Sequence, residues 1–210
     1  MKKQQNLLLL VLLLGLSIIL NSCQKNPASP PLPSTPTTVR IGEANYSVHL
    51  IGSQLWTILN YAGPGGRAFK TGTEKPEYGR YYTFAEAKAI PMPTGWRLPT
   101  MQDYLIMAQQ QGIIFTNGRA TNQEAIKKLT SVTNWRSIAG TNASEFNAYP
   151  AGYWFENNEP QEGDIVEFWT AEGNTISIQE NAAGQTHIIR FYNNSTSTAY
   201  RFNLRFVRDY

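Results

Sequence analysis

Cys23 is the one cysteine among the 210 residues of the chain, so its thiol has no partner for an intramolecular disulfide. It follows an apolar run that ends at Leu20, with Asn21 and Ser22 in between. A single cysteine directly after a membrane-targeting segment favours attachment of lipid over redox chemistry or metal binding. We therefore predict that Cys23 carries a fatty acyl chain such as palmitate. The alternative is an ordinary secreted protein with one free thiol.

A second candidate site is a loop in which oxygen-bearing side chains follow aromatic ones. The sequence from Trp154 to Asp164 contains four carboxylates and three amides. Calcium takes six to eight oxygen ligands, so calcium is one cofactor that such a loop could hold. A solvated hairpin loop explains the same composition without any ligand. As a hypothesis, we place a ligand-binding face at Tyr153, Trp154, Glu156, Asn158, Glu159 and Gln161.

Other chemistry finds little support in the sequence. The two histidines, His49 and His187, both fall in strand-like segments, and no free cysteine is available to join them in a zinc site. Neither the Gly-x-Ser-x-Gly pattern of serine hydrolases nor a phosphate-binding Gly-x-x-x-x-Gly-Lys occurs. We therefore expect no enzymatic activity, no catalytic residue and no bound metal. A carboxylate-pair glycosidase stays open, because such pairs are assembled in space.

The N-terminal residues predict export. Lys2 and Lys3 precede the apolar run Leu7–Leu20, which is long enough for a signal peptide but shorter than the ~20 residues of a membrane-spanning helix. The residues from Leu20 to Cys23 resemble a bacterial lipobox, which makes residues 1–22 a lipoprotein signal peptide. Residues 23–38 then hold the lipidated cysteine and a proline-rich segment, expected to be a stiff, extended tether.

The charge balance argues against nucleic-acid binding. Residues 1–22 contain two of the 18 basic residues and none of the 15 acidic ones, so the rest of the chain is nearly neutral. Charged residues make up 16% of the chain and aromatic ones 12%, and much of the remaining polarity comes from amides and hydroxyls. Such a surface gives no electrostatic reason to bind nucleic acid, and it suits weakly charged partners, sugars among them.

Residues 39–210 have the size of one domain and contain both helix and strand patterns. Strands are expected at 39–42 and 46–51, followed by three helices with capping-box starts at Thr83, Thr100 and Thr121, the last reaching about Thr130. Alternation of apolar and polar residues then predicts strands at 165–170, 175–178, 187–192 and 200–207. In the last of these, Phe202, Leu204 and Phe206 should face one side and Arg201, Asn203 and Arg205 the other.

Several segments together resemble the Fibrobacter succinogenes major paralogous domain, which is common in lipoproteins of Bacteroidetes and Fibrobacteres. In order and spacing they cover nearly all of residues 39–210, and they are Ile51–Trp56, Tyr78–Thr83 with Ala85, Ala87 and Ala89, Gly95–Thr100, Phe146–Gly152, Phe168–Glu172 and Leu204–Asp209. The resemblance implies a relative of the C-type-lectin-like fold. It transfers no settled activity to any residue of this chain.

The resemblance also carries expectations about the scaffold. Many members have a cysteine where this chain has Met92 and another where it has Phe206, so packing is expected to replace a disulfide. The tryptophans of the shared segments, Trp56, Trp96 and Trp169, are expected in the core. Their arginines are expected in buried or half-buried ion pairs, namely Arg80, Arg97, Arg205 and Arg208.

Together these observations predict an α+β protein with a single C-type-lectin-like domain at residues 39–210. Short helices should occupy its N-terminal half and antiparallel hairpins its C-terminal half. We expect an outer-membrane lipoprotein, on the periplasmic or extracellular face, that acts as a non-enzymatic binding or adhesion module for glycan or protein ligands. A structural envelope protein without a soluble ligand is the alternative, and an enzyme on the same fold is the third hypothesis.

Overall fold

The first sheet forms where the proline-rich segment ends. The computed structural model describes residues 35–181, 183 and 185–210, so the predicted signal peptide, Cys23 and most of the predicted tether lie outside the described residues. Three strands follow one another as antiparallel hairpins, β1 (Thr38–Ile41), β2 (Ala44–Ile51) and β3 (Gln54–Thr57). Gly42 and Gly52 occupy the turns with φ of 60° and 65°, a backbone conformation that glycine adopts readily.

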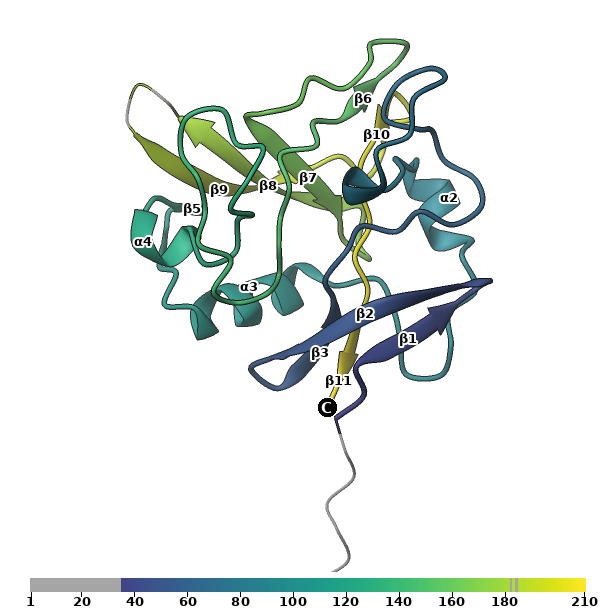
Figure 1. Cartoon of the computed structure of the whole chain (residues 1–210), viewed down its shortest axis with the longest axis horizontal. Helices are drawn as coiled ribbons and strands as arrows, with labels where there is room; N and C mark the ends of the chain where they lie inside the picture. The colour runs from purple at the N-terminus through teal and green to yellow at the C-terminus, as the bar shows by residue number, and fades with distance from the viewer. Residues whose placement is uncertain (1–34, 182, 184) are drawn as a thin grey trace, which may run out of the picture. The chain divides into compact units, whose positions relative to one another are not determined.

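The chain ends in this same sheet. β11 (Val207–Asp209) pairs antiparallel with β3, which gives the strand order β1-β2-β3-β11. Figure 1 shows the C-terminus beside the start of the described chain, and Thr35 Oγ1 lies 3.0 Å from the hydroxyl of Tyr210. The residues from Thr35 to Tyr210 form one compact unit. β1 and β2 confirm two predicted strands, whereas β3 was not predicted.

Two helices begin at predicted capping boxes. In α2 (Phe84–Lys88) and α3 (Met101–Gln110), the Thr83 and Thr100 hydroxyls accept hydrogen bonds from the backbone at Glu86 and Asp103, and those acids accept bonds in return. These reciprocal bonds satisfy backbone donors that a helix start leaves free. A short 3₁₀ helix, η2 (Pro76–Tyr78), precedes them.

The third predicted capping box is wrong. α4 spans only Gln123–Ile126, and its N-cap is Asn122, which makes no capping hydrogen bond. The Asn122 side chain instead accepts from Ile114 N at 3.2 Å and donates to Gly112 O at 2.7 Å. These two hydrogen bonds stabilise the hairpin that precedes α4 and not the start of α4 itself. That hairpin, β4 (Phe115–Thr116) and β5 (Arg119–Ala120), turns at Asn117 and Gly118, both with positive φ.

The second sheet lies in the C-terminal half, as predicted. It has the order β4-β5-β9-β8-β7, and its long strands are β7 (Ile165–Trp169), β8 (Asn174–Asn181) and β9 (Thr186–Asn193). A separate two-stranded ribbon joins β6 (Trp154–Phe155) to β10 (Tyr200–Arg201), and in Figure 1 it lies next to β7. All strand pairs are antiparallel. The described residues therefore confirm the α+β class.

The predicted strand at residues 200–207 is confirmed only at its two ends and is wrong in between. β10 ends at Arg201 and β11 begins at Val207, and the residues between them run through the interior with almost every side chain buried. Asn203 and Arg205, expected on the face opposite to Phe202, Leu204 and Phe206, are fully buried as well. The Asn203 side chain donates to the backbone oxygens of Tyr78 and Arg80 at 3.0 and 3.1 Å. Because internal hydrogen bonds replace water, polar residues in this segment do not mark an exposed face.

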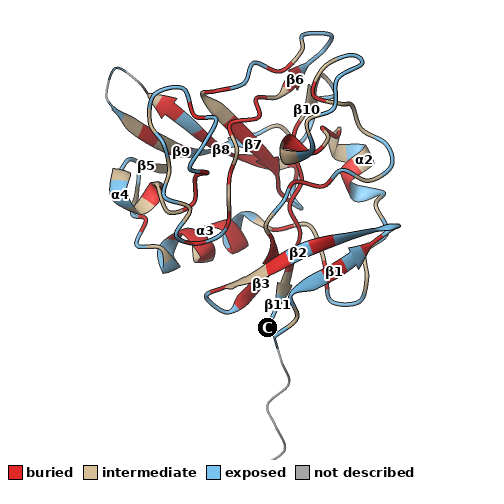
Figure 2. Ribbon diagram, viewed as in Figure 1, coloured by how far each residue is buried: buried red, intermediate tan, exposed pale blue. Residues whose placement is uncertain are grey.

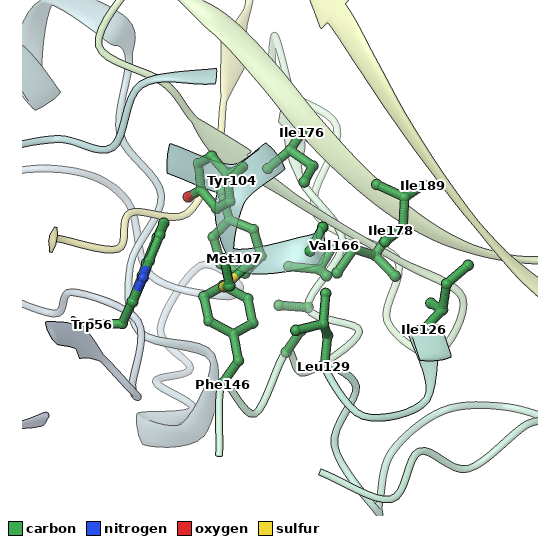
Figure 3. Close-up of a cluster of buried hydrophobic side chains, with 14 of the residues drawn as sticks. Trp56, Tyr104, Met107, Ile126, Leu129, Phe146, Val166, Ile176, Ile178 and Ile189 are labelled. Carbon is green, nitrogen blue, oxygen red and sulfur yellow. The ribbon is translucent and has the colours of Figure 1, made fainter. Parts of the chain in front are cut away.

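Two buried clusters hold the unit together (Figure 2). In the larger one, Tyr104 and Met107 of α3 lie against Ile176 and Ile178 of β8, with Phe146 close by (Figure 3). Each large apolar side chain buried in this way contributes roughly 1.5–3 kcal/mol. The smaller cluster lies between the first sheet, α2 and the C-terminal segment, and it includes both Met92 and Phe206. Packed apolar side chains therefore occupy both positions at which the family resemblance implied a cysteine.

The tryptophan prediction is confirmed and the arginine prediction is confirmed in part. Trp56, Trp96 and Trp169 are all buried. Arg97 pairs with Asp103 and Asp209, and Arg80 pairs with Glu74. Neither of the other two arginines forms an ion pair with any described carboxylate. Arg205 donates to Asn60 Oδ1 and to the backbone oxygens of Thr57 and Asn147, while the Arg208 guanidinium lies 5.9 Å from the Trp96 ring.

Candidate functional site

The outer face of the second sheet carries polar side chains in register. Glu167 of β7 lies opposite Ser177 of β8, and Ser177 lies opposite Arg190 of β9. One step along the sheet, Ile165 lies opposite Gln179. The alternate residues of these strands, such as Val166, Phe168, Ile176 and Ile178, face the larger buried cluster. The period of two along a strand therefore separates an apolar core face from a second, more polar face.

A group of aromatic rings, which we call the wall, lies beside this face. The ring of Tyr153 lies 5.9 Å from that of Tyr200 and 5.6 Å from that of Phe202. Phe155 extends the wall, with its ring 4.9 Å from Tyr200. These edge-to-face and tilted contacts are the arrangements that aromatic pairs favour, so the wall holds its shape without a ligand.

Buried anchors fix the β6–β10 ribbon that carries the wall. The indole of Trp154 donates to Ala68 O at 2.9 Å, and the Arg67 guanidinium lies 4.9 Å from the same ring. On the other strand, Arg201 donates to Glu86 Oε2 at 2.5 Å, which ties β10 to the start of α2. Gly152 has φ of 68°, and a Cβ atom there would lie 2.4 Å from Gln161 O. Glycine is therefore required where the chain enters the ribbon.

Between the wall and the sheet lie two adjacent hollows, which we call the groove. The first has a volume of about 340 Å³ and is lined by Gly152, Tyr153, Phe155, Asn158, Glu159, Gln161, Asp164, Ile165 and Gln179. The second has a volume of about 360 Å³ and is lined by Tyr153, Ile165, Glu167, Gln179, Tyr192, Asn193, Asn194, Tyr200 and Phe202. Three residues line both hollows. Each volume falls within the range of small-ligand pockets.

Glu167 gives the second hollow a buried carboxyl group. It is 7% exposed, and its Oε2 accepts a hydrogen bond from Thr175 Oγ1 at 3.0 Å. Burial raises the pKa of Glu167 to about 7, although hydrogen bonds from Thr175 and Ser177 act in the opposite direction. At neutral pH a large fraction of this group is therefore protonated and can donate a hydrogen bond as well as accept one.

The carboxylates of the acidic loop are held apart by different partners. Glu159 accepts a bond from Thr71 N at 2.9 Å, and this bond lowers its pKa. Glu162 pairs with Lys75, and Asp164 lies 3.4 Å from Arg136. Within the described part of the chain, no group of three or more histidine, cysteine, aspartate or glutamate side chains is placed to hold a metal ion.

The structure brings together four of the six residues predicted for the ligand face. Tyr153, Asn158, Glu159 and Gln161 all line the first hollow. Trp154 does not, because its ring is buried and bonded to Ala68. Glu156 also lies outside the groove lining.

The sequence analysis missed the residues that approach from other elements. These are Ile165 and Gln179 in both hollows and Glu167, Tyr192, Asn193, Asn194, Tyr200 and Phe202 in the second; Phe155, next to Trp154 in the predicted loop, was missed as well. One signal could have found some of them. Tyr192 and Tyr200 flank the polar turn that follows β9, and aromatic residues on both sides of an amide-rich turn suggest an exposed aromatic face. Glu167 gave no such signal, because its burial depends on residues distant in sequence.

Two further hollows lie elsewhere and differ in chemistry. One of about 370 Å³ is lined by Ile41, Glu43, Ala44, Ala62, Gly63, Pro64, Gly65 and Arg80. Another of about 510 Å³ is lined by Lys127, Ser137, Ile138, Ala139 and Gln185. Neither has an aromatic side chain among its described lining residues. The groove is therefore the better candidate for a site that needs ring faces.

No helix among residues 35–181, 183 and 185–210 combines the length and the apolar character needed to cross a membrane. Residues 60–208 match the family model described as the Fibrobacter succinogenes major domain, so strands β1–β3 precede the matched region while most of β11 lies within it. Neither the curated proteins nor the solved structures gave a match to the chain.

Proposed function

Because the chain belongs to the Fibrobacter succinogenes major domain family, we propose that it is an exported lipoprotein whose domain binds a glycan or protein ligand without transforming it. The groove is the proposed binding site. One observation supports this proposal above the others: five aromatic side chains and five amides line two adjacent hollows. The five rings are Tyr153, Phe155, Tyr192, Tyr200 and Phe202, and the amides are Asn158, Gln161, Gln179, Asn193 and Asn194.

This chemistry favours a glycan over a protein segment. A pyranose ring has an apolar face of C–H groups that packs on an aromatic ring, and hydroxyl groups around its edge that pair with amides. Tyr192 and Phe155 are 40% and 36% exposed, so their rings are available without any rearrangement. Sites for small polar ligands share this pattern of apolar walls with a few polar groups that fix orientation.

A binding role also agrees with the carboxyl groups of the groove. Hydrolysis of a glycosidic bond ordinarily requires two carboxyl groups on opposite sides of that bond. Glu167 is the one carboxyl among the described residues lining the second hollow. In the first hollow, Glu159 and Asp164 are each engaged, by Thr71 N and by Arg136. These contacts favour positioning of a ligand over proton transfer to it.

The proposed location follows from the sequence of the first 38 residues. A lipid on Cys23 would hold the protein at the outer membrane, because each buried CH₂ of an acyl chain contributes about 0.8 kcal/mol. The proline-rich tether would then hold the domain away from the membrane surface. Either face of the outer membrane is compatible with this arrangement.

Binding of the full chain, purified in detergent, to an array of soluble oligosaccharides tests the proposal. We expect saturable binding to at least one class, with the affinity reduced at least about tenfold by Tyr192→Ala or Phe155→Ala. Tyr210→Ala is the matched control, because Tyr210 is 54% exposed but lies outside the groove. Equal losses in all three variants would contradict the assignment of the groove. Release of shorter sugars would instead show an enzyme.

A further inference from the structure

We propose that the groove selects sugar chains without acidic groups, and that one chain occupies both hollows. This inference rests on the proposed function and specifies its ligand class. Its basis is the charge of the groove lining and the way the two hollows share their central residues. Neither feature depends on which sugar is bound.

The lining carries acids and no bases. Among the described residues, Glu159, Asp164 and Glu167 line the two hollows, and no lysine, arginine or histidine does. A carboxylate or sulfate group on the ligand would therefore meet negative charge without an opposite charge to pair with. Like charges at close range repel at the effective dielectric constant of a protein surface, which weakens binding of an acidic chain. An uncharged chain meets no such penalty.

Several cations lie near the groove, but they are not among its described lining residues. Arg136 pairs with Asp164, with Nη1 and Oδ2 3.4 Å apart. Arg190 shares the outer face of the sheet with Glu167 but lies two strands away from it, and Arg201 is bound to Glu86. Lys70 acts on Glu159 only through space. These cations moderate the acids but do not present a basic surface to a ligand.

The two hollows meet at residues that can contact successive sugars. Tyr153, Ile165 and Gln179 line both hollows. Ile165 and Gln179 are cross-strand partners in the sheet, and Tyr153 stands opposite them in the aromatic wall. A chain lying along the groove would thus be sandwiched at its middle, with Phe155 beyond one end and Tyr192 beyond the other. Affinity should therefore rise with chain length until both hollows are filled.

Gln179 provides the sharpest test, because it is exposed at the middle of the groove. The probes are cellotetraose, mannotetraose and tetra-N-acetylchitotetraose as non-acidic chains, with tetragalacturonate and a hyaluronan tetrasaccharide as acidic ones. Calorimetry is performed on the full chain in detergent. We expect at least one non-acidic probe to bind at least about tenfold more tightly than either acidic probe, and its disaccharide to bind at least about tenfold more weakly.

Gln179→Lys should raise the affinity for the acidic probes about tenfold at low salt, and 0.5 M sodium chloride should remove most of that gain. Gln111→Lys, on the surface after α3, is the matched control and should leave every affinity unchanged. The inference is overturned if an acidic probe binds wild type as tightly as the best non-acidic one. If that acidic binding is lost in Tyr192→Ala, the groove assignment still stands. If none of the five probes binds, both the inference and the assignment of the groove to glycans fail.

Discussion

Glu167 Oε2 accepts a hydrogen bond from Thr175 Oγ1 at 3.0 Å, and Thr175 Oγ1 accepts one from Asn194 Nδ2 at 2.9 Å. This short chain of bonds joins a buried carboxyl group on β7 to an amide at the rim of the groove. Asn194 and Glu167 both line the second hollow. The protonation state of the buried acid is therefore coupled to the orientation of a group that a ligand would meet.

The raised pKa of Glu167 predicts how stability depends on pH. In the unfolded chain the group ionises near 4.5, whereas in the folded protein it ionises near 7. The folded state thus holds the extra proton between these values, and the free energy of unfolding should fall as pH rises from about 4.5 to 7. The difference between the two pKa values corresponds to a loss of roughly 3 kcal/mol in the free energy of unfolding over this pH range. Glu167→Gln, which keeps an acceptor for Thr175, should remove this loss.

Urea denaturation at pH 4, 5.5 and 7.5 measures the effect. Glu167→Gln should be about as stable as wild type at pH 4 and clearly more stable at pH 7.5. Glu156→Gln is the control, because Glu156 is exposed and its carboxylate makes none of the described hydrogen bonds. Parallel pH profiles for wild type and Glu167→Gln would show that Glu167 titrates normally.

Replacement of Asp103 should strongly reduce the stability of the folded protein. Its carboxylate accepts bonds from Thr100 N at 2.6 Å, from Gln54 Nε2 at 2.6 Å and from the Arg97 guanidinium. Asp103→Ala removes one half of the capping box, leaves Thr100 N without its acceptor and leaves Arg97 and Gln54 with Asp209 alone. We therefore expect a loss of about 2–4 kcal/mol in the free energy of unfolding. Asp209→Ala, at an exposed carboxylate that also contacts Arg97, should cost under about 1 kcal/mol.

Acid titration provides a second readout on the same residue. Hydrogen bonds from Arg97, Thr100 and Gln54 lower the pKa of Asp103 to about 2, against burial that acts the other way. The stabilisation is therefore complete above the ordinary value of 3.8 and is lost as pH falls from there to about 2. If Asp103→Ala and Asp209→Ala show equal stability near neutral pH, this description of Asp103 is wrong.

Arg205 should resist even replacement by lysine. It is fully buried, and its guanidinium donates to Asn60 Oδ1 at 2.7 Å, to Thr57 O at 2.9 Å and to Asn147 O at 3.1 Å. Burial lowers its pKa to about 9, so it remains charged at neutral pH. A lysine cannot reproduce the planar fork, and Arg205→Lys should lose about 2–4 kcal/mol.

Thermal unfolding compares this variant with Arg208→Lys. Arg208 lies over Trp96, and the charge and most of the contact survive in lysine, so its melting temperature should change by only a few degrees. A tolerated Arg205→Lys would mean that the three acceptors do not need the guanidinium.

The prediction that a lipid anchors the chain in a membrane depends on Cys23. Cells expressing the wild-type chain should incorporate radiolabelled palmitate into it, and the protein should sediment with membranes. Cys23→Ser should abolish labelling and release the protein into the soluble fraction, because the acyl chain is the proposed anchor. Ser29→Ala, a short way further along the predicted tether, is the control and should retain the label. Equal labelling of the Cys23→Ser variant would contradict the anchor.

Local signals in the sequence were enough to predict much of the fold. The capping boxes at Thr83 and Thr100 and the alternation in β7, β8 and β9 act over a few residues, and the structure confirms them. The β4–β5 hairpin escaped notice because its strands have two residues each, too few for a period to appear. The buried run from Phe202 to Phe206 could not be predicted, because the partners of Asn203 and Arg205 lie more than 50 residues away.

The candidate site also has a part that local sequence predicts and a part that depends on tertiary contacts. Composition alone identified the loop that supplies Tyr153, Asn158, Glu159 and Gln161 to the groove. Trp154 lies outside the groove lining, and nothing near it in the sequence reveals its bond to Ala68 O, 86 residues away. The second hollow forms only where β7, β8, β9 and β10 meet the segment before β6, and its acid becomes buried only when they do. Such a site is a product of the tertiary structure.

The central claim is that the groove is where this domain meets its ligand. Tyrosine ring signals in an NMR titration of the full chain with the non-acidic tetrasaccharides test it most directly. Tyr153, Tyr192 and Tyr200 should shift with a common saturation curve, while Tyr61 and Tyr210, outside the groove, should not move. The claim would be contradicted if the three groove tyrosines stayed unchanged at saturating sugar, or if only the tyrosines outside the groove responded.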